Sequence, residues 1–224
     1  MRTLGLTMRV VEAEGYAECR DALSADWPGL FETGDFVPLL LPNQWEVAVR
    51  YFEQGRIDAV VLTGGNSLGP VLGGVDASAG TRRRDIFEKQ LLEYTTARRI
   101  PVIGVCRGMQ VINAFYGGTL SRVAANVHVA KTHEVALVEA FQNVFPGFTK
   151  VNSYHEFGIT PGSLGRGLVP FAMSTDGIVE GLVSTEAPVM ATMDHPERQA
   201  GQRELFFRNI ERMIKEGMFW KGSI

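Results

Sequence analysis

The hydrophobic residues of this chain gather in short runs that turn-forming residues separate. Each run has the length of a strand rather than of a helix. Continuous apolar runs of this length are typical of strands that are buried on both faces of a sheet. The predicted strands are Leu4–Met8, Phe36–Leu41, Ile57–Leu62, Pro101–Val105, Val135–Val138, Leu168–Met173, Ile178–Val183 and Val189–Met193.

Segments of helical length lie between several of these runs. The predicted helices are Asn43–Gln54, Arg82–Arg98 capped by Thr81, Arg107–Tyr116 and Glu197–Glu216. Alternating buried strands and helices predict an α/β fold with a mostly parallel central sheet and helices on both faces. In the second half the strands follow one another more closely, which indicates an antiparallel extension of the sheet. We expect one domain over residues 1–224.

A cysteine ends one of the buried runs. Cys106 follows the strand Pro101–Val105 and precedes the helix that begins at Arg107, with Gly104 and Gly108 two residues to either side. Glycines at these positions relieve the crowding of a sharp strand-to-helix turn, which is how many enzymes present a nucleophile. A helix N-terminus lowers the pKa of a thiol and makes it reactive near neutral pH. A buried, inert cysteine is the alternative interpretation.

The predicted partners of Cys106 follow the last strand. His195 and Glu197 are two residues apart, so in extended backbone both side chains point to the same side and the carboxylate can hold the imidazole. Cys106 would attack, His195 would move the proton and Glu197 would fix the tautomer of the ring. The alternative is a His-Pro sequence that only ends a strand.

A glycine pair follows another strand of the predicted parallel sheet. The backbone N–H of Gly65, together with that of Arg107, could bind the oxyanion of a tetrahedral intermediate. An ordinary loop turn would have the same glycines.

Composition narrows the classes of function. The chain has 224 residues, 45% of them hydrophobic and 21% charged, which is typical of a globular protein. The formal net charge of −3 and the short basic cluster Arg82–Arg84 do not favour nucleic acid as a partner. No apolar run is long enough for a membrane span, and the N-terminal residues lack the pattern of a signal peptide. With two cysteines in different settings, Cys19 and Cys106, we expect a cytoplasmic protein with a free catalytic thiol.

Three motifs, in this order, resemble the class I glutamine amidotransferase family and its γ-glutamyl hydrolase relatives: Thr63–Gly65, Gly104–Gln110 and His195–Glu197. Two further features, Arg84-Asp85 with Glu88 and the segment Val151–Glu156, resemble the free-standing γ-glutamyl-CDP-amidate and γ-glutamyl-γ-aminobutyrate hydrolases.

The resemblance implies a γ-glutamyl thioester on Cys106, an oxyanion hole at Gly65 and Arg107, no cofactor, and a small γ-glutamyl substrate. The substrate-binding residues that it implies are Gln110, Ser153, Tyr154, His155 and Asn66. For a leaving group that carries phosphate, Arg82, Arg83 and Arg84 are the expected contacts.

The chain departs from the family at Asp194, where relatives usually have tryptophan. A carboxylate there could contact a cationic substrate group or raise the pKa of His195.

Two features carry less information. His128 and His133 flank Lys131 in a polar segment and, without a nearby carboxylate or cysteine, make a poor metal-ligand set, so we expect solvated side chains and no metal. The glycine-rich segment Ser67–Gly80 is either a lid or a surface loop.

Three other functions compete with a free-standing hydrolase. A glutaminase subunit would use the same residues to deliver ammonia to a synthetase partner, which we do not expect for this chain; a homodimer is compatible with the sequence. A cysteine-elbow α/β-hydrolase would place its acid before the histidine. A small-molecule binding module would have no need of all three side chains.

Overall fold

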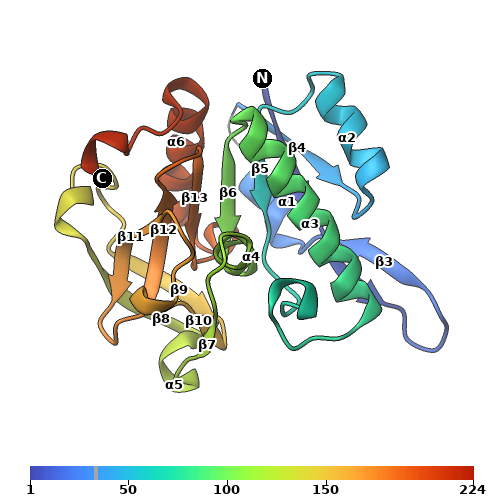
Figure 1. The fold of residues 1–224 in the computed structure, drawn as a ribbon, viewed down its shortest axis with the longest axis horizontal. Helices are drawn as coiled ribbons and strands as arrows, with labels where there is room; N and C mark the ends of the chain where they lie inside the picture. Colours follow the sequence, from blue (N-terminus) through green and yellow to red (C-terminus); the bar gives the residue numbers. More distant parts are fainter. Residues whose placement is uncertain (33–34) are drawn as a thin grey trace.

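A nine-stranded sheet forms the centre of the computed structural model, which describes residues 1–32 and 35–224. The strand order is β4-β1-β5-β6-β13-β12-β11-β8-β9 (Figure 1). The strands of this sheet are β1 (Arg2–Thr7), β4 (Phe36–Leu41), β5 (Ala59–Leu62), β6 (Val102–Val105), β8 (Val129–Leu137), β9 (Lys150–Tyr154), β11 (Leu168–Ser174), β12 (Val179–Ser184) and β13 (Val189–Thr192). Two small antiparallel pairs join β2 (Arg9–Glu12) to β3 (Cys19–Ala22) and β7 (Ser121–Arg122) to β10 (Phe157–Gly158).

The sheet changes direction at β13. Strands β4, β1, β5, β6 and β13 run parallel, whereas β12, β11, β8 and β9 each pair antiparallel with their neighbours. Fully buried strands such as β5, β6 and β13 explain the continuous apolar runs of the sequence, since helices cover both of their faces. The predicted parallel sheet with an antiparallel extension is confirmed.

Two groups of helices flank the sheet. The helices are α1 (Asp26–Leu30), α2 (Trp45–Glu53), α3 (Ala79–Arg98), α4 (Arg107–Phe115), α5 (Ala125–His128) and α6 (Ala200–Glu216). Helix α3 contacts α2 and α4, and Figure 1 shows α3 and α4 in front of the sheet, with α6 behind it. Trp27 of α1 packs against Phe206 of α6, with ring centroids 6.3 Å apart. Short 3-10 helices include Pro70–Leu72 and Pro196–Arg198.

Several predicted boundaries were wrong. Helix α3 begins at Ala79 because the Ser78 side chain, rather than Thr81, caps it by accepting a hydrogen bond from the Thr81 N–H. Helix α6 begins at Ala200, after the separate 3-10 turn. Strand β8 is much longer than the run Val135–Val138, and β9 was not predicted, because both carry polar residues.

The glycine-rich segment Ser67–Gly80 lies at the surface, and two of its leucines anchor it to the core. Leu68 and Leu72 are buried, and the Gly69 N–H donates to Asp85 of α3 at 2.8 Å. Within the described ranges, no helix is long and apolar enough to cross a membrane.

Candidate functional site

Cys106 lies on the sharp turn between β6 and α4. Its backbone has φ of 51° and ψ of −104°, a conformation that non-glycine residues rarely adopt and that clusters at functional sites. The turn needs small residues on both sides. A Cβ at Gly104 would lie 2.7 Å from the Gly108 carbonyl carbon, and one at Gly108 would lie 2.1 Å from the Leu62 oxygen. The chain therefore accepts a strained, close-packed turn to place this thiol at the end of a parallel strand.

His195 reaches the thiol from the end of β13. Its side chain lines the same cleft as Cys106, and its Nδ1 lies 2.7 Å from Glu197 Oε1. The pairing of His195 with Glu197 does not come from extended backbone, because the 3-10 turn Pro196–Arg198 brings the carboxylate back to the ring. A Cβ at Gly64 would lie 2.9 Å from His195 Cε1, so glycine is needed for this approach.

Asn152 holds the backbone of His195. Its side-chain oxygen accepts the His195 N–H at 2.7 Å, and its amide nitrogen donates to the His195 carbonyl at 2.9 Å. Both groups are buried, so this two-bond contact fixes the position of the residue that carries the imidazole.

Electrostatics favour the charged form of His195. Burial lowers its pKa, but attraction to the Cys106 thiolate and hydrogen bonds with Cys106 and Glu197 outweigh burial and raise the pKa to about 10. The imidazolium form of His195 is therefore favoured at neutral pH.

Four buried charged residues support the other side of the turn; we call them the arginine–carboxylate cluster: Arg84, Asp85, Glu88 and Arg107. Arg84 Nε donates to Glu88 at 2.9 Å, and Arg107 donates to Asp85 at 2.5 Å and also to Glu88. Burial alone would raise the pKa of Glu88, but Arg107 and Arg84 together lower it. For Asp85 burial prevails over Arg107 and raises the pKa.

This cluster fixes the candidate oxyanion loop. The Arg84 guanidinium donates to the carbonyls of Thr63 at 2.7 Å and of Gly64 and Gly65 at 3.1 Å each. Neither the Gly65 nor the Arg107 N–H has a carbonyl or side-chain acceptor in the described part of the chain. Two free amides thus border the thiol, as an oxyanion hole requires.

The thiol opens into a cleft of about 480 Å³. Its lining comes from the ends of parallel strands and from the segment after β9: Arg9, Gly65, Asn66, Ser67, Cys106, Arg107, Gln110, Tyr154, His155, Glu156, Phe157, His195 and Arg198. The volume is typical of a site for a small molecule.

Comparisons with known proteins agree with this arrangement. The sequence pattern of the family described as Peptidase C26 matches residues 5–197. The chain belongs to the Peptidase C26 family. It is 31% identical to a γ-glutamyl-CDP-amidate hydrolase of Campylobacter jejuni over 88% of this chain and 91% of that protein. It is also 30% identical to the protein NtpR of Enterococcus hirae over 74% of this chain and 77% of that protein.

A solved structure has the same fold. The crystal structure of a glutamine amidotransferase from Thermotoga maritima superposes with a TM-score of 0.60 at 19% identity, covering 99% of this chain and 94% of that one. The membership and the fold together make this chain a glutamine amidotransferase-like hydrolase with a mostly parallel sheet.

The structure brings most of the predicted substrate-binding residues of this Peptidase C26 member into the cleft. Gln110, Tyr154 and His155 line it, with Gln110 Nε2 donating to the Phe157 carbonyl at 2.9 Å. Burial lowers the pKa of His155 to about 4, so its ring is neutral near pH 7. Asn66 lines the cleft as well, but its amide is hydrogen-bonded to the Val10 backbone.

The prediction for Ser153 was wrong. Its side chain is fully buried away from the cleft and donates to the His128 carbonyl at 2.7 Å, because alternate residues of β9 point to opposite faces of the strand.

The predicted contacts to a leaving group were also wrong. Arg84 is buried in the arginine–carboxylate cluster and holds a loop, Arg83 pairs with Asp21, and neither these two nor Arg82 lines the cleft.

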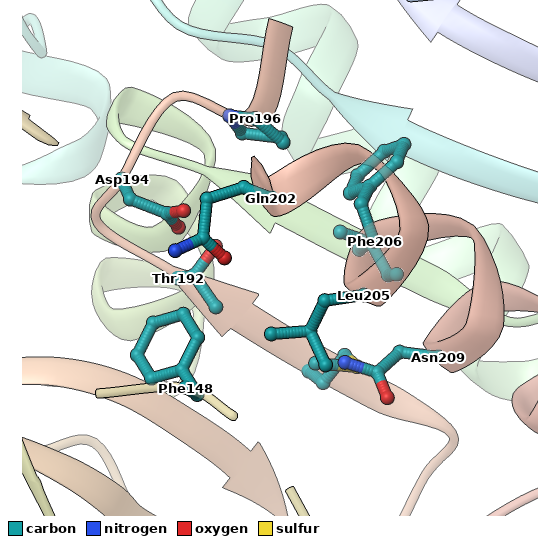
Figure 2. A pocket seen from close by; sticks show the side chains of 10 residues that line it. Phe148, Thr192, Asp194, Pro196, Gln202, Leu205, Phe206 and Asn209 are labelled. Atoms are coloured by element: carbon teal, nitrogen blue, oxygen red, sulfur yellow. The ribbon is translucent and has the colours of Figure 1, made fainter. Parts of the chain in front are cut away.

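Asp194 does not face the substrate either. It faces a cavity of about 20 Å³ under α6, and Figure 2 shows its carboxylate and the Gln202 amide turned toward each other. Burial raises the pKa of Asp194 to about 6 despite a hydrogen bond with Thr192.

His128 and His133 are not solvated, as the sequence had led us to expect. His128 is fully buried and the side chain of His133 is only 13% exposed. They lie on α5 and β8, next to Glu180 of β12.

Three contributors to the site were not predicted from the sequence. Arg9 and Arg198 line the cleft from β2 and the 3-10 turn, and Asn152 clamps His195. Arg9 is the first residue of a strand that was not predicted, and Arg198 comes close only because the turn after His195 bends. Asn152 lay within a motif of the resemblance, although its contact could not be inferred from spacing.

Proposed function

We propose that this protein is a cysteine-dependent hydrolase that cleaves a γ-glutamyl amide through a γ-glutamyl thioester and releases glutamate. The observation that carries the proposal is the convergence in one cleft of the strained Cys106, the His195–Glu197 pair and the free amides of Gly65 and Arg107. Nucleophile, base, orienting carboxylate and oxyanion donors are the parts that acyl transfer requires.

In the first half of the reaction, the Cys106 thiolate attacks the γ-carbonyl carbon. The carbonyl oxygen gains charge and accepts hydrogen bonds from the two free amides. The C–N bond then breaks, and the leaving nitrogen takes the proton of the His195 imidazolium.

In the second half, His195 removes a proton from water as the water oxygen attacks the thioester carbonyl. The C–S bond breaks, glutamate leaves, and Cys106 regains the thiolate state beside a protonated His195. Glu197 holds the ring in one orientation through both steps.

The charges of the cleft favour a leaving group that carries phosphate. Arg9 Nε is buried and has no hydrogen-bond partner among the described residues, and Arg198 lies over the Tyr154 ring at 4.5 Å. Guanidinium groups are suited to phosphate oxygens. Glu156 also lines the cleft, but its side chain is 66% exposed. With Asp194 outside the cleft, a cationic leaving group loses its expected partner. We therefore take γ-glutamyl-CDP-amidate as the first candidate substrate.

The test is glutamate release by the purified chain from three substrates: γ-glutamyl-CDP-amidate, γ-glutamyl-γ-aminobutyrate and glutamine. We expect kcat/KM to be highest for the first, because binding energy from the larger group contributes to the transition state. Arg198→Gln should lower kcat/KM for that substrate by about tenfold or more, the worth of one charge-assisted hydrogen bond. Arg82→Gln, outside the cleft, is the matched control and should leave it unchanged.

Other outcomes point elsewhere. Preference for γ-glutamyl-γ-aminobutyrate would support an amine hydrolase. Glutamine as the best substrate, or activity only with an added synthetase, would support a glutaminase subunit. Full activity in Cys106→Ala would overturn the thioester itself.

A further inference from the structure

A second group of chemically active side chains lies next to the cleft. The sequence has four histidines, and the three other than His195 gather around one buried carboxylate. We call His128, His133, His155 and Glu180 the histidine–glutamate cluster. Glu180 Oε1 lies 3.5 Å from His128 Nδ1, 3.5 Å from His133 Nε2 and 3.7 Å from His155 Nε2.

The outward-facing nitrogen of each ring already has a hydrogen-bond partner. His128 Nε2 lies 2.9 Å from the Asp176 carboxylate, His133 Nδ1 lies 3.2 Å from the Glu134 carbonyl, and His155 Nδ1 lies 3.1 Å from the Phe157 carbonyl. All three partners can only accept a hydrogen bond, so each outward nitrogen donates. In a neutral ring the inward nitrogen then carries a lone pair. Metal-binding histidines show this same arrangement of outer acceptors.

The inward-facing atoms, by contrast, have no partners. His128 Nδ1, His133 Nε2, His155 Nε2 and both Glu180 carboxylate oxygens are buried without a hydrogen bond in the described residues. Buried polar atoms are nearly always paired, because leaving one unpaired costs about 1–3 kcal/mol. Five such atoms in one place indicate that the protein side chains are only part of this site.

A metal ion accounts for the unpaired atoms of His128, His133 and Glu180 together. Zn²⁺ binds imidazole nitrogen and carboxylate oxygen at about 2.0–2.2 Å with tetrahedral geometry, which places neighbouring ligand atoms roughly 3.3 Å apart. The observed separations of 3.5 to 3.7 Å from Glu180 Oε1 are close to this value. A single added proton would pair only one imidazole with Glu180 and leave the other two unpartnered. We propose that His128, His133 and Glu180, whose ligand atoms all lie within 4.8 Å of one another, bind one divalent cation, with Zn²⁺ as the best match in ligand chemistry. His155 lies outside this set of ligands and contacts it through Glu180.

Two nitrogens and one oxygen would fill three positions of a tetrahedral shell and leave the fourth open. His155 is both a member of the cluster and part of the cleft lining, and the Phe157 carbonyl that fixes its ring also accepts from Gln110. The ion would therefore tie α5 and β8 to β12 beside the segment 154–157, one wall of the cleft in which His195 lies.

The first experiment measures metal content. The full-length protein, loaded with zinc and desalted, is analysed by elemental mass spectrometry. We expect about one zinc per chain in the wild type and at least a tenfold loss in His133→Ala. His133→Cys, which keeps a zinc ligand at a partly exposed position, should restore binding. The control is Cys106→Ala. This variant removes the thiol in the cleft with His195, which lies outside the proposed metal site, and should keep its zinc.

The second experiment guards against a variant that fails to fold. Zinc added to chelator-treated wild-type protein should raise the unfolding temperature by several degrees, because an ion that binds only the folded state stabilises it. His133→Ala should show no such rise. Absence of zinc and of the temperature shift in the wild type would overturn the proposal. Loss of zinc in Cys106→Ala but not in His133→Ala would also overturn it and would place the metal on the thiol.

Discussion

The two buried polar clusters on either side of the cleft are built in opposite ways. In the arginine–carboxylate cluster every carboxylate oxygen of Asp85 and Glu88 accepts a hydrogen bond from an arginine or a backbone amide. In the histidine–glutamate cluster both oxygens of Glu180 and three ring nitrogens face one another with no donor between them. The carboxylates of the first cluster are fully paired, whereas the second cluster presents unpaired acceptor atoms to one another.

The difference shows how buried charge can serve a site. Two arginines and two carboxylates cancel in charge and bring their own donors, so the cluster holds the Thr63–Gly65 loop without a ligand. The three histidines around Glu180 bring no donor to its carboxylate oxygens, so on our proposal a cation holds the opposite wall. The cleft thus has one wall fixed by protein alone and, on our proposal, one fixed by a metal.

The sharpest test substitutes glutamine for the central glutamate of each cluster in chelator-treated protein. Glu88→Gln should lower the free energy of unfolding by about 3–5 kcal/mol, because it leaves two buried guanidinium groups with one carboxylate. Glu180→Gln should lower the free energy of unfolding by clearly less, because the Glu180 oxygens accept no hydrogen bond from the described residues that the substitution could remove. Urea unfolding of both variants measures this. Equal decreases in the free energy of unfolding would show that the carboxylates of the two clusters are equally well paired.

The next largest effect concerns Asn152, which lies on β9 beside the histidine–glutamate cluster but clamps His195. Asn152→Ala should destabilise the protein by about 1–3 kcal/mol through unpaired buried backbone groups. It should also lower kcat by about 10–100-fold, because a displaced imidazole is a poor base.

Asn113 is the matched control, since among the described residues its buried side chain bonds only to Thr119, Ser163 and Gly165. Asn113→Ala should lose stability and keep kcat. A normal kcat in Asn152→Ala would mean that the turn Pro196–Arg198 holds His195 by itself.

A smaller effect is expected at Glu197, which belongs to neither cluster and contacts His195. The raised pKa of His195 adds folding stability that is complete below about 6.5, the ordinary value, and is lost as pH rises through about 10. The same ionisation should set the alkaline limit of kcat/KM. In Glu197→Gln, which lacks the carboxylate charge, this limit should move to lower pH while much of the activity at neutral pH remains. If the alkaline limit of kcat/KM did not move in Glu197→Gln, the raised pKa of His195 would be due to Cys106 alone.

The smallest effect is expected at Asp194. Because its carboxylate faces the cavity under α6, Asp194→Asn should change kcat/KM by less than about twofold for each of the three substrates, a difference below about 0.5 kcal/mol. A larger decrease of kcat/KM for γ-glutamyl-γ-aminobutyrate alone would show that Asp194 contributes to binding this substrate.

The parts of the site that are local in sequence were predicted well. Gly104–Gly108 predicts a turn that only small residues allow, and the structure has this turn, with Cys106 at positive φ. The pairing of His195 with Glu197 was correct in outcome although the backbone reason was wrong, because residues two apart can meet in extended or in 3-10 backbone. The catalytic roles of these residues stay predictions.

Arginines were the main source of error. A cluster such as Arg82–Arg84 predicts positive charge, but not which guanidinium reaches solvent, substrate or a buried carboxylate. Helical geometry decided this: Arg84 and Glu88 are one turn apart on the buried face of α3, while Arg83 turns outward to Asp21.

The sequence by itself determined the α/β fold, since continuous apolar runs between helices fit only a sheet covered on both faces. It also determined the sharp turn at Cys106, since the glycine spacing of this turn is a local steric requirement. Only the tertiary structure decided where polar side chains converge. His133 of β8 and Glu180 of β12 lie in the antiparallel part of the sheet, while His128 ends α5 and His155 directly follows β9. Strand register, which no local pattern encodes in polar strands, sets which of them meet.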